Sequence, residues 1–223
     1  MNEIEFKQAI LAKQDKYHIH HPFHIRMNSG GCTQKEIQIW VANRFYYQEM
    51  IPRKDAAILA NCPDSEIRKE WIKRIQDHDG GGGLSSWISL GVSVGLTKEI
   101  LESHTMLLPG VKFAVDAYYN FCREENYHDA MTSSLTELFA PEIHQVRLDN
   151  WPVYYPWIDQ PGYNYFRKRL GEATRDVSFT LDYAVNHYIT PTEQAYALTI
   201  IDFKLNVLWC MLDSIGIECD KIR

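Results

Sequence analysis

Apolar residues recur along most of the chain at helical spacing, and strand-like alternation does not persist over any useful length. This periodicity is that of amphipathic α-helices and favours an all-α fold. Pro52 is expected to kink or break the second helix, and the aromatic, proline-bearing stretch at 151–162 is expected to be a loop. The spacing predicts helices over residues 2–14, 34–59, 64–78, 84–94, 97–104, 110–124, 126–139, 141–149, 160–187 and 191–218.

Cationic residues interrupt several of the apolar helix faces. Lys204 lies three residues after Ile201 and four before Leu208, on the apolar stripe of the last predicted helix. A lysine that faces a core needs a partner, because an unpaired buried charge is costly. In the helix after Gly162, Tyr165 and Arg169 lie four apart and share one side. Two further faces mix cations with apolar residues in the same way: Trp40, Arg44, Tyr47, Gln48 and Ile51, and Ile67, Trp71, Arg74, Ile75 and His78.

These inward cations have two explanations. Each one alone could lay its stem along apolar surface with the charge in water, or could pair with a carboxylate. Several together are explained more simply by a shared anionic ligand or by a polar, hydrated cavity. The sequence therefore predicts a pocket for a polyanion.

Composition limits the class of protein. The 223 residues are 45% hydrophobic and 23% charged, with no visible linker or repeat, so we expect one globular domain over residues 1–223. A net charge of −6 argues against nucleic acid as a partner. The five cysteines have irregular spacing and form no CxxC pair, which suggests neither a disulfide framework nor a zinc ribbon. The N-terminus lacks an export signal and no segment approaches eighteen unbroken apolar residues, so we expect a cytoplasmic protein without a membrane partner.

The stretch SSLTELFAPEIHQVR places a carboxylate and a histidine at helical spacing. Glu137 and His144 are seven apart and Arg147 follows three later, so an unbroken helix would put all three on one side, although a proline lies between. A Glu and a His at this spacing could be half of a di-iron site in a helical bundle. We expect no metal, because Arg169 is a facing candidate and a fixed positive charge disfavours a cation. A di-iron oxidase remains the alternative.

Histidines mark two other segments. YHIHHPFH, from Tyr17 to His24, is expected to be a loop interrupted by Pro22 whose side chains diverge, forming either a solvated loop or a wall that contacts a ligand. His78 ends a predicted helix in RIQDHDGGGG, where the glycines could let a lid close over it. A capping histidine in a surface turn is the alternative. The glycines do not form a phosphate loop, because the preceding strand and the following GK[ST] are missing.

Eight stretches of the chain resemble the pyrroloquinoline-quinone (PQQ) synthase family, PqqC. The resemblance runs from about Tyr17 to Asp213 and implies a compact haem-oxygenase-like helical bundle, akin to thiaminase II, with a central ligand cavity and a homodimeric state. The glycine run is shorter than is common in the family, and the tail of longer members is missing. The stretches are YHIHHPFH, WVANRFYYQ, IPRKDAAILANCPD, RIQDHDG, LPGVKFAVDAYYNF, SSLTELFAPEIHQVRLDNWP, GYNYFRKRL and FKLNVLWCMLD.

The activity implied by this resemblance is a cofactor-free oxidation. The family closes a ring in a bicyclic ortho-quinone precursor, oxidises it by eight electrons to PQQ with O2 as acceptor, and releases H2O2. The precursor carries three carboxylates, which would explain the inward cations, and its own quinone would serve as the electron sink. A carrier that binds PQQ without catalysis is a second alternative.

The resemblance also implies roles for individual residues. His78 would act as general base and acid, which suits an imidazole that titrates near neutrality. His144, Tyr165 and Arg169 would form the pocket for oxygen and peroxide, and Glu137 would complete the catalytic set. The substrate would be held by Tyr17, His18, Arg44, Gln48, Lys54, Arg74, Tyr118, Arg147 and Lys204.

Overall fold

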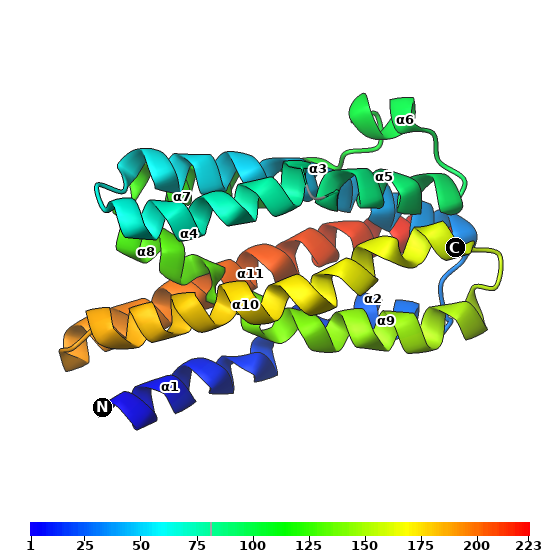
Figure 1. Ribbon diagram of the computed structural model, residues 1–223. Helices are drawn as coiled ribbons and strands as arrows, with labels where there is room; N and C mark the ends of the chain where they lie inside the picture. Colours follow the sequence, from blue (N-terminus) through cyan, green and yellow to red (C-terminus); the bar gives the residue numbers. More distant parts are fainter. Residues whose placement is uncertain (81) are drawn as a thin grey trace.

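The computed structural model describes the backbone of residues 1–80 and 82–223, and the side chains of all of these except 172–178. In this part of the chain helices follow one another without a strand, so the predicted all-α fold is confirmed (Figure 1). The α-helices are α1 (Glu3–Leu11), α2 (Pro22–Asn28), α3 (Gln34–Asn61), α4 (Ser65–Ile75), α5 (Gly83–Ser93), α6 (Lys98–Glu102), α7 (Pro109–Glu124), α8 (Tyr127–Thr132), α9 (Ala140–Tyr154), α10 (Asn164–His187) and α11 (Pro191–Lys221). Shorter helical turns are η1 (Ala12–Lys16), η2 (His18–His20), η3 (Gln76–Gly80), η4 (Ser133–Phe139) and η5 (Gln160–Tyr163).

Capping residues determine where the long helices begin. Thr33 and Glu36 form a reciprocal capping box at the start of α3, and Thr190 and Glu193 form another at the start of α11. Asp64 accepts hydrogen bonds from two backbone N–H groups in the first turn of α4. These caps satisfy donors that the helix itself cannot pair, so the predicted starts at 34, 64 and 191 agree with the structure to within one residue.

The helices pack around one buried cluster. In Figure 1, α11 runs through the middle of the molecule behind α10, with α3 and α7 above it and α9 below. The helix pairs α3–α7, α7–α11 and α9–α10 lie in contact. Trp40 of α3 packs against Trp87 of α5 and Trp151 of α9, with ring centroids 5.3 and 5.7 Å apart, and all three rings are buried. These aromatic contacts join the upper and lower helices.

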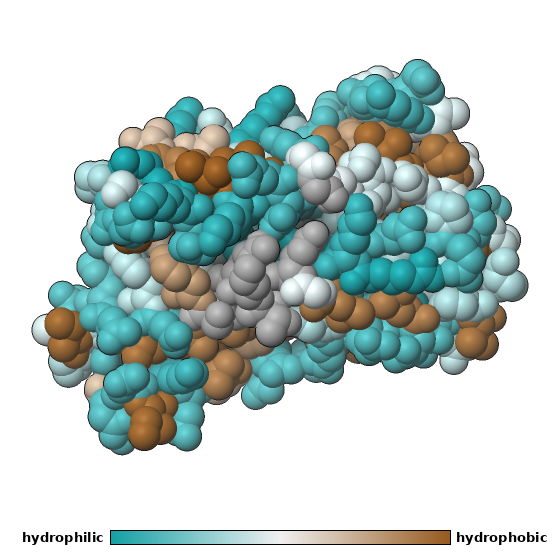
Figure 2. Space-filling model, in the orientation of Figure 1, coloured by the Kyte–Doolittle hydropathy of each residue, from teal (hydrophilic) through white to brown (hydrophobic). Residues whose placement is uncertain are grey.

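Helix α11 supplies the centre of the core. Its predicted apolar stripe is confirmed, since Ala197, Ile201, Leu205, Leu208 and Leu212 are all buried. Among the described residues, α11 is long and apolar enough to cross a membrane by length and composition alone, but a core helix passes the same test, and half of its apolar stretch is buried inside the molecule. Hydrophilic side chains cover much of the face seen in Figure 2, with hydrophobic ones in scattered patches.

The histidine-rich segment differs from its prediction. It forms the turn η2 and the helix α2, which begins at Pro22, because the fixed backbone angle of proline suits the first helical position. The side chain of His21 caps this helix by accepting from the N–H of Phe23. The histidines do not all diverge, since the Nδ1 atoms of His18 and His24 lie 3.1 Å apart.

Three other element predictions need correction. Helix α3 continues through Pro52, which is buried inside it, so the helix is not broken there, and a kink stays a prediction; tertiary packing overrides the lost hydrogen bond. Helix α9 extends through Pro152 to Tyr154 and shortens the expected loop. The predicted helix at 126–139 is divided into α8 and the 3₁₀ turn η4. Pro141 has no N–H to donate to the carbonyl of Glu137, so the α-helical hydrogen-bond pattern is interrupted between η4 and α9.

A π-helical turn and glycines position His78. Turn η3 follows α4 and buries the imidazole, which is 3% exposed. Gly82 has a φ of +92°, in the left-handed region that glycine adopts readily. A Cβ on Gly83 would lie 3.1 Å from the Cα of His78 and 3.2 Å from its Nδ1, so a larger residue there would have to displace His78 by a few tenths of an ångström. Gly81, part of the predicted lid, lies outside the described residues.

Candidate active site

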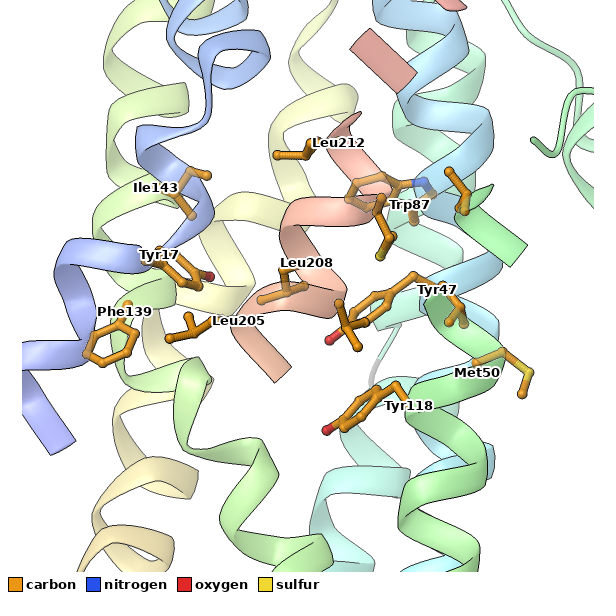
Figure 3. Packing of buried hydrophobic residues seen from close by; sticks show 14 of the residues in the cluster. Tyr17, Tyr47, Met50, Trp87, Tyr118, Phe139, Ile143, Leu205, Leu208 and Leu212 are labelled. Atoms are coloured by element: carbon orange, nitrogen blue, oxygen red, sulfur yellow. The ribbon is translucent and has the colours of Figure 1, made fainter. Parts of the chain in front are cut away.

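A cavity lies inside the bundle, between α3 on one side and α9 and α10 on the other. Figure 3 shows Tyr17 and Tyr47 projecting from opposite sides toward Leu208 of α11. The wall of the cavity is more polar than most of a protein interior, because it contains arginines, histidines and tyrosine hydroxyls. The wall consists of Tyr17, His18, Arg44, Tyr47, Gln48, Ile51, Trp87, Thr136, Glu137, Ala140, Ile143, His144, Arg147, Tyr165, Arg169 and Leu208.

The cavity is narrow. The space inside it that water-sized molecules can occupy is about 40 Å³. A single water needs roughly 10–15 Å³ of such space, so the cavity admits a few waters. Binding of a bicyclic molecule therefore requires the surrounding side chains or helices to move apart.

The structure brings the predicted site residues together at this cavity. Nine of them line it: Tyr17, His18, Arg44, Gln48, Glu137, His144, Arg147, Tyr165 and Arg169. The other five lie directly behind its wall: Lys54 and Tyr118 in a smaller adjoining pocket, Arg74 against Glu137, His78 against Gln48, and Lys204 against Tyr47. The predicted inward placement of cations from several helices is thus confirmed.

Five charged residues form a network of ion pairs, which we call the paired group: Lys54, Asp55, Arg74, Glu137 and Arg169. Lys54 lies 2.7 Å from Asp55, and Arg74 lies 2.7 Å from Glu137 and 3.6 Å from Asp55. Arg169 reaches the other oxygen of Glu137 at 3.4 Å. Burial opposes ionisation of Glu137, but the charges of Arg74, Arg169 and Lys54 hold the pKa of its carboxyl well below the usual range. The carboxylate is therefore ionised and held between two guanidiniums.

Three further cations lie against aromatic rings, and we call them the aromatic-held group: Arg44, Arg147 and Lys204. The guanidinium of Arg44 lies 3.9 Å from the ring centroid of Tyr47, and that of Arg147 lies 4.7 Å from Trp40. The ammonium of Lys204 lies 3.5 Å from the ring of Tyr118 and donates to the hydroxyl of Tyr47 at 2.7 Å. These are cation–π contacts, which stabilise a buried cation only partly.

The electrostatics of the two groups differ. Burial and the charge of Arg44 lower the pKa of Arg147 to about 9. Burial, followed by the charges of Arg44 and Lys54, lowers the pKa of Lys204 well below its usual value. None of the aromatic-held cations forms an ion pair with a carboxylate of the described residues. Arg44 and Arg147 thus line the cavity, and Lys204 lies behind it, without a carboxylate partner among the described residues, and this positive charge favours an anionic ligand.

His78 lies behind the cavity wall, within reach of the ligand-facing amide of Gln48. Its Nε2 is 3.2 Å from Gln48 Oε1, which also accepts from the Tyr165 hydroxyl at 3.0 Å. Burial and the charge of Arg169 lower the pKa of His78 to about 4. The expectation that this imidazole titrates near neutrality is therefore wrong for the ligand-free protein, in which His78 is a neutral base at pH 7.

His144, Tyr165 and Arg169 share one side of the cavity, as the spacing of Tyr165 and Arg169 predicts. The ring of His144 lies 5.8 Å from that of Tyr165, edge to face. Its Nδ1 is buried and has no hydrogen-bond partner among the described residues. Burial and the charges of Arg147 and Arg169 lower its pKa well below the usual value, so the ring is neutral.

Within the described residues, no group of three or more histidine, cysteine or acidic side chains is placed to hold a metal ion. Glu137 and His144 both line the cavity, but both oxygens of Glu137 face guanidiniums. Such a carboxylate is already neutralised by fixed charge.

The sequence analysis did not identify two buried residues that contact cations of the site, Asp55 and His24, or most of the uncharged residues that line the cavity. Asp55 is fully buried and joins Lys54, Arg74 and the indole N–H of Trp71. Its position four residues after Ile51 could have placed it on the inward face of the helix. A helix predicted to begin at Pro22, as α2 does, would have placed His24 on a regular helix face instead of in a loop. The unassigned wall residues are Tyr47, Ile51, Trp87, Thr136, Ala140, Ile143 and Leu208.

Comparison with solved structures defines the class of the fold. A TenA homologue from Pseudomonas syringae pv. tomato strain DC3000 superposes with a TM-score of 0.78 at 11% identity, covering 96% of this chain and 91% of that one. A domain with a haem oxygenase-like fold from Shewanella denitrificans OS217 also gives 0.78, at 13% identity, covering 100% and 95%. The chain therefore has a haem-oxygenase-like helical fold that encloses a cationic cavity, and the fold implied by the resemblance is confirmed.

The family follows from sequence. The model of the TENA/THI-4/PQQC family matches residues 7–214, and the chain belongs to this family. A protein of Pseudomonas putida strain F1 named pyrroloquinoline-quinone synthase is 56% identical over 227 aligned residues, covering 100% of this chain and 90% of that protein. One of the same name from Pseudomonas syringae pv. syringae strain B728a is 57% identical over the same shares. The resemblance noted from the motifs is thereby confirmed.

Proposed function

We propose that this protein is a pyrroloquinoline-quinone synthase, an oxidoreductase that converts a bicyclic ortho-quinone tricarboxylate into PQQ with O2 as the electron acceptor. The observation that carries the proposal is the aromatic-held group, whose three cations have no carboxylate partner among the described residues. Relatives with that name are more than half identical over the whole chain. A ligand with three carboxylates supplies the negative charge that the described side chains around the cavity lack.

The aromatic-held group is suited to bind the carboxylates. Arg44 and Arg147 line the cavity, and a guanidinium pairs with a carboxylate through two parallel hydrogen bonds. Lys204 lies behind Tyr47 and adds charge through the hydroxyl to which it donates. Tyr17, His18 and Gln48 complete this wall with hydrogen-bonding groups. Anion binding replaces the weak contacts with aromatic rings by strong ion pairs.

His78 is suited to remove protons from the substrate. The Nε2–H of the neutral imidazole donates to Gln48 Oε1 and so fixes the orientation of the ring, and the lone pair on Nδ1 is the group that accepts a proton at pH 7. A bound polyanion would raise the pKa of His78 from about 4 toward neutrality, because negative charge favours the imidazolium. His78 then serves as base while protons leave the ring and as acid when reduced oxygen is protonated.

Oxygen is reduced on the side of the cavity that carries His144, Tyr165 and Arg169. The fixed charge of Arg169 stabilises negative charge as it develops on oxygen. Glu137 holds Arg169 and Arg74 in place through its two oxygens. The substrate's own quinone accepts the first electrons, so the proposed reaction uses no protein-bound cofactor or metal. The homodimeric state and cytoplasmic location implied by the resemblance remain predictions, which light scattering and cell fractionation test.

Turnover of the bicyclic precursor tests this function. Purified protein incubated with precursor in air should form PQQ, followed by absorbance, and should release H2O2, whereas an anaerobic incubation should stop before PQQ. Chelator-treated protein should keep its activity. Binding of PQQ without any turnover would favour a carrier, and activity that is lost on chelation and restored by iron would favour a di-iron oxidase.

Two substitutions separate the proposed steps. His78→Ala should impair proton removal, while Arg169→Ser should impair oxygen reduction, and both proteins should still bind PQQ. The absorbance of intermediates that accumulate in each variant distinguishes the two defects. Full multi-turnover PQQ formation by either variant would contradict the role assigned to that residue.

A further inference from the structure

A chain of hydrogen bonds runs from Arg147 through His24 to His18. Arg147 Nη2 lies 3.3 Å from His24 Nε2, and His24 Nδ1 lies 2.9 Å from the carbonyl oxygen of His18 and 3.1 Å from His18 Nδ1. All three side chains are buried. His18 and Arg147 line the cavity, whereas His24 lies behind its wall, in a small adjoining pocket that also contains His18 and Trp40.

The first contact fixes the tautomer of His24. A guanidinium has only N–H donors, so the Nε2 atom of His24 must be the acceptor and must carry a lone pair. Burial and the charge of Arg147 lower the pKa of His24 well below its usual value, so the ring is neutral. A neutral ring with a lone pair on Nε2 carries its proton on Nδ1. That N–H donates to the carbonyl of His18.

The second contact fixes the tautomer of His18. Its Nδ1 lies beside the N–H of His24 at 3.1 Å, so it must present a lone pair, because two facing N–H groups would repel. Burial, together with the positive charges of Arg44 and Arg147, lowers the pKa of His18 well below its usual value, so this ring is also neutral. Its proton therefore lies on Nε2. That atom is buried and has no hydrogen-bond partner among the described residues.

We propose that His24 is a positioning residue that fixes His18 as the Nε2–H tautomer, so that His18 offers a hydrogen-bond donor to an acceptor oxygen of the ligand in the cavity. The identity of that ligand as a quinone tricarboxylate rests on the proposed function, whereas the two tautomers do not. Carboxylate and quinone oxygens accept hydrogen bonds. The other tautomer of His18 would present a lone pair to them and would repel them.

Nuclear magnetic resonance of ligand-free protein labelled with ¹⁵N-histidine tests the tautomers directly. Protonated and unprotonated ring nitrogens give separate signals, and His18→Phe and His24→Phe spectra assign them. We expect a protonated Nε2 in His18 and a protonated Nδ1 in His24. A protonated Nδ1 in His18, or a rapid exchange between its tautomers, would overturn the proposal.

PQQ binding to a set of variants tests the consequence. His24→Phe, which removes both ring nitrogens, should weaken PQQ binding about tenfold, the loss expected when a hydrogen bond to a charged group is no longer oriented. His24→Asn keeps a donor near the position of Nδ1 and should restore most of the affinity. His24→Gln keeps an acceptor for Arg147 without that donor and should not. The exposed His20→Phe is the matched control and should bind as wild type does.

A double-mutant cycle shows whether His24 acts through His18. In a His18→Phe background, the further change His24→Phe should alter PQQ affinity less than twofold. An unchanged tenfold effect in that background, or equal affinities of the Asn and Gln variants, would overturn the proposal. If wild-type protein binds no PQQ, the proposed function fails instead, and the proposed tautomers are then supported or overturned by the resonance spectra alone.

Discussion

The paired group and the aromatic-held group surround the same cavity, yet they balance their charge in different ways. In the paired group, Asp55 and Glu137 bring carboxylates to within 2.7 Å of Lys54 and Arg74. In the aromatic-held group, rings of tyrosine and tryptophan take the place of carboxylates. An aromatic ring stabilises a buried cation much less than a carboxylate does. Carboxylates of the fold itself balance the paired group, whereas in the proposed function an anionic ligand balances the aromatic-held group.

The largest effect is expected from removing a carboxylate of the paired group. Glu137→Gln removes the carboxylate that Arg74 and Arg169 share, and breaking buried ion pairs in this way costs about 3 kcal/mol. Urea denaturation measures the loss. Asp220→Asn, which breaks an exposed pair with Arg26, is the control and should cost less than about 1 kcal/mol. Equal losses in the two variants would show that the paired group does not stabilise the fold.

The buried, neutral state of His78 can be tested through the pH dependence of the free energy of unfolding. The folded-state pKa of His78 is about 4, below an unfolded value of about 6.5. Between these values the unfolded chain binds more protons, so stability falls as the pH falls, by up to about 1.4 kcal/mol per pH unit. Lowering the pH from 6.5 to 5 should therefore remove about 2 kcal/mol through His78.

The variant His78→Gln isolates this contribution from that of the other buried histidines. Denaturation of wild type and variant between pH 4 and 7 should show a shallower loss of stability in the variant. The exposed His20→Gln serves as the control and should follow the wild-type curve. Parallel curves for wild type and His78→Gln would contradict the buried, neutral state of His78.

Substituting an arginine of the aromatic-held group should affect binding more than folding. Arg147→Met removes a buried charge that no carboxylate of the described residues balances, so the ligand-free protein should be as stable as wild type or more stable. PQQ should bind about tenfold more weakly, the loss of one charge-assisted hydrogen bond. Arg74→Met, in the paired group, should instead destabilise the ligand-free protein. Calorimetry and denaturation of both variants distinguish the groups, and the reverse pattern would contradict the comparison.

The smallest effect is expected at Lys204, which lies behind the cavity wall. Lys204→Met keeps the apolar stem and deletes the charge, so the ligand-free protein should be no less stable. PQQ binding should weaken a fewfold, because the ammonium acts through the hydroxyl of Tyr47. A thermal-shift series with and without PQQ measures both effects. Equal stabilisation of the two proteins by PQQ would assign Lys204 to the core rather than to the site.

The sequence was informative where helical periodicity meets charge. The spacing of Lys204, Arg74 and Arg44 was sufficient to place these cations inward, because side chains three and four residues apart share a helix face. Helical spacing could not show which residue balances the charge of each cation. The Asp55 and Glu137 carboxylates reach Arg74 from helices far apart in the chain, and no local pattern encodes that contact.

The histidine-rich segment marks the other limit. The proline in YHIHHPFH was taken as an interruption, whereas Pro22 begins α2 and thereby turns His24 toward His18. Proline breaks a helix in its interior but favours its first position, and tertiary packing decides between these two roles. The lowered pKa of His78 could not be predicted from local sequence, because it results from burial and from the charge of Arg169, which is distant in the chain.

The central claim is that the cavity is built for the carboxylates of a quinone, and thermal denaturation with PQQ and with its trimethyl ester tests it most directly. At a hundredfold excess over Kd, PQQ should stabilise the folded protein by about 2.7 kcal/mol, or roughly 5–10 °C for a domain of this size. The ester keeps the rings but carries no carboxylate charge, so it should give almost no shift. Equal shifts with PQQ and the ester would contradict the account, because the buried cations would then play no part in recognition.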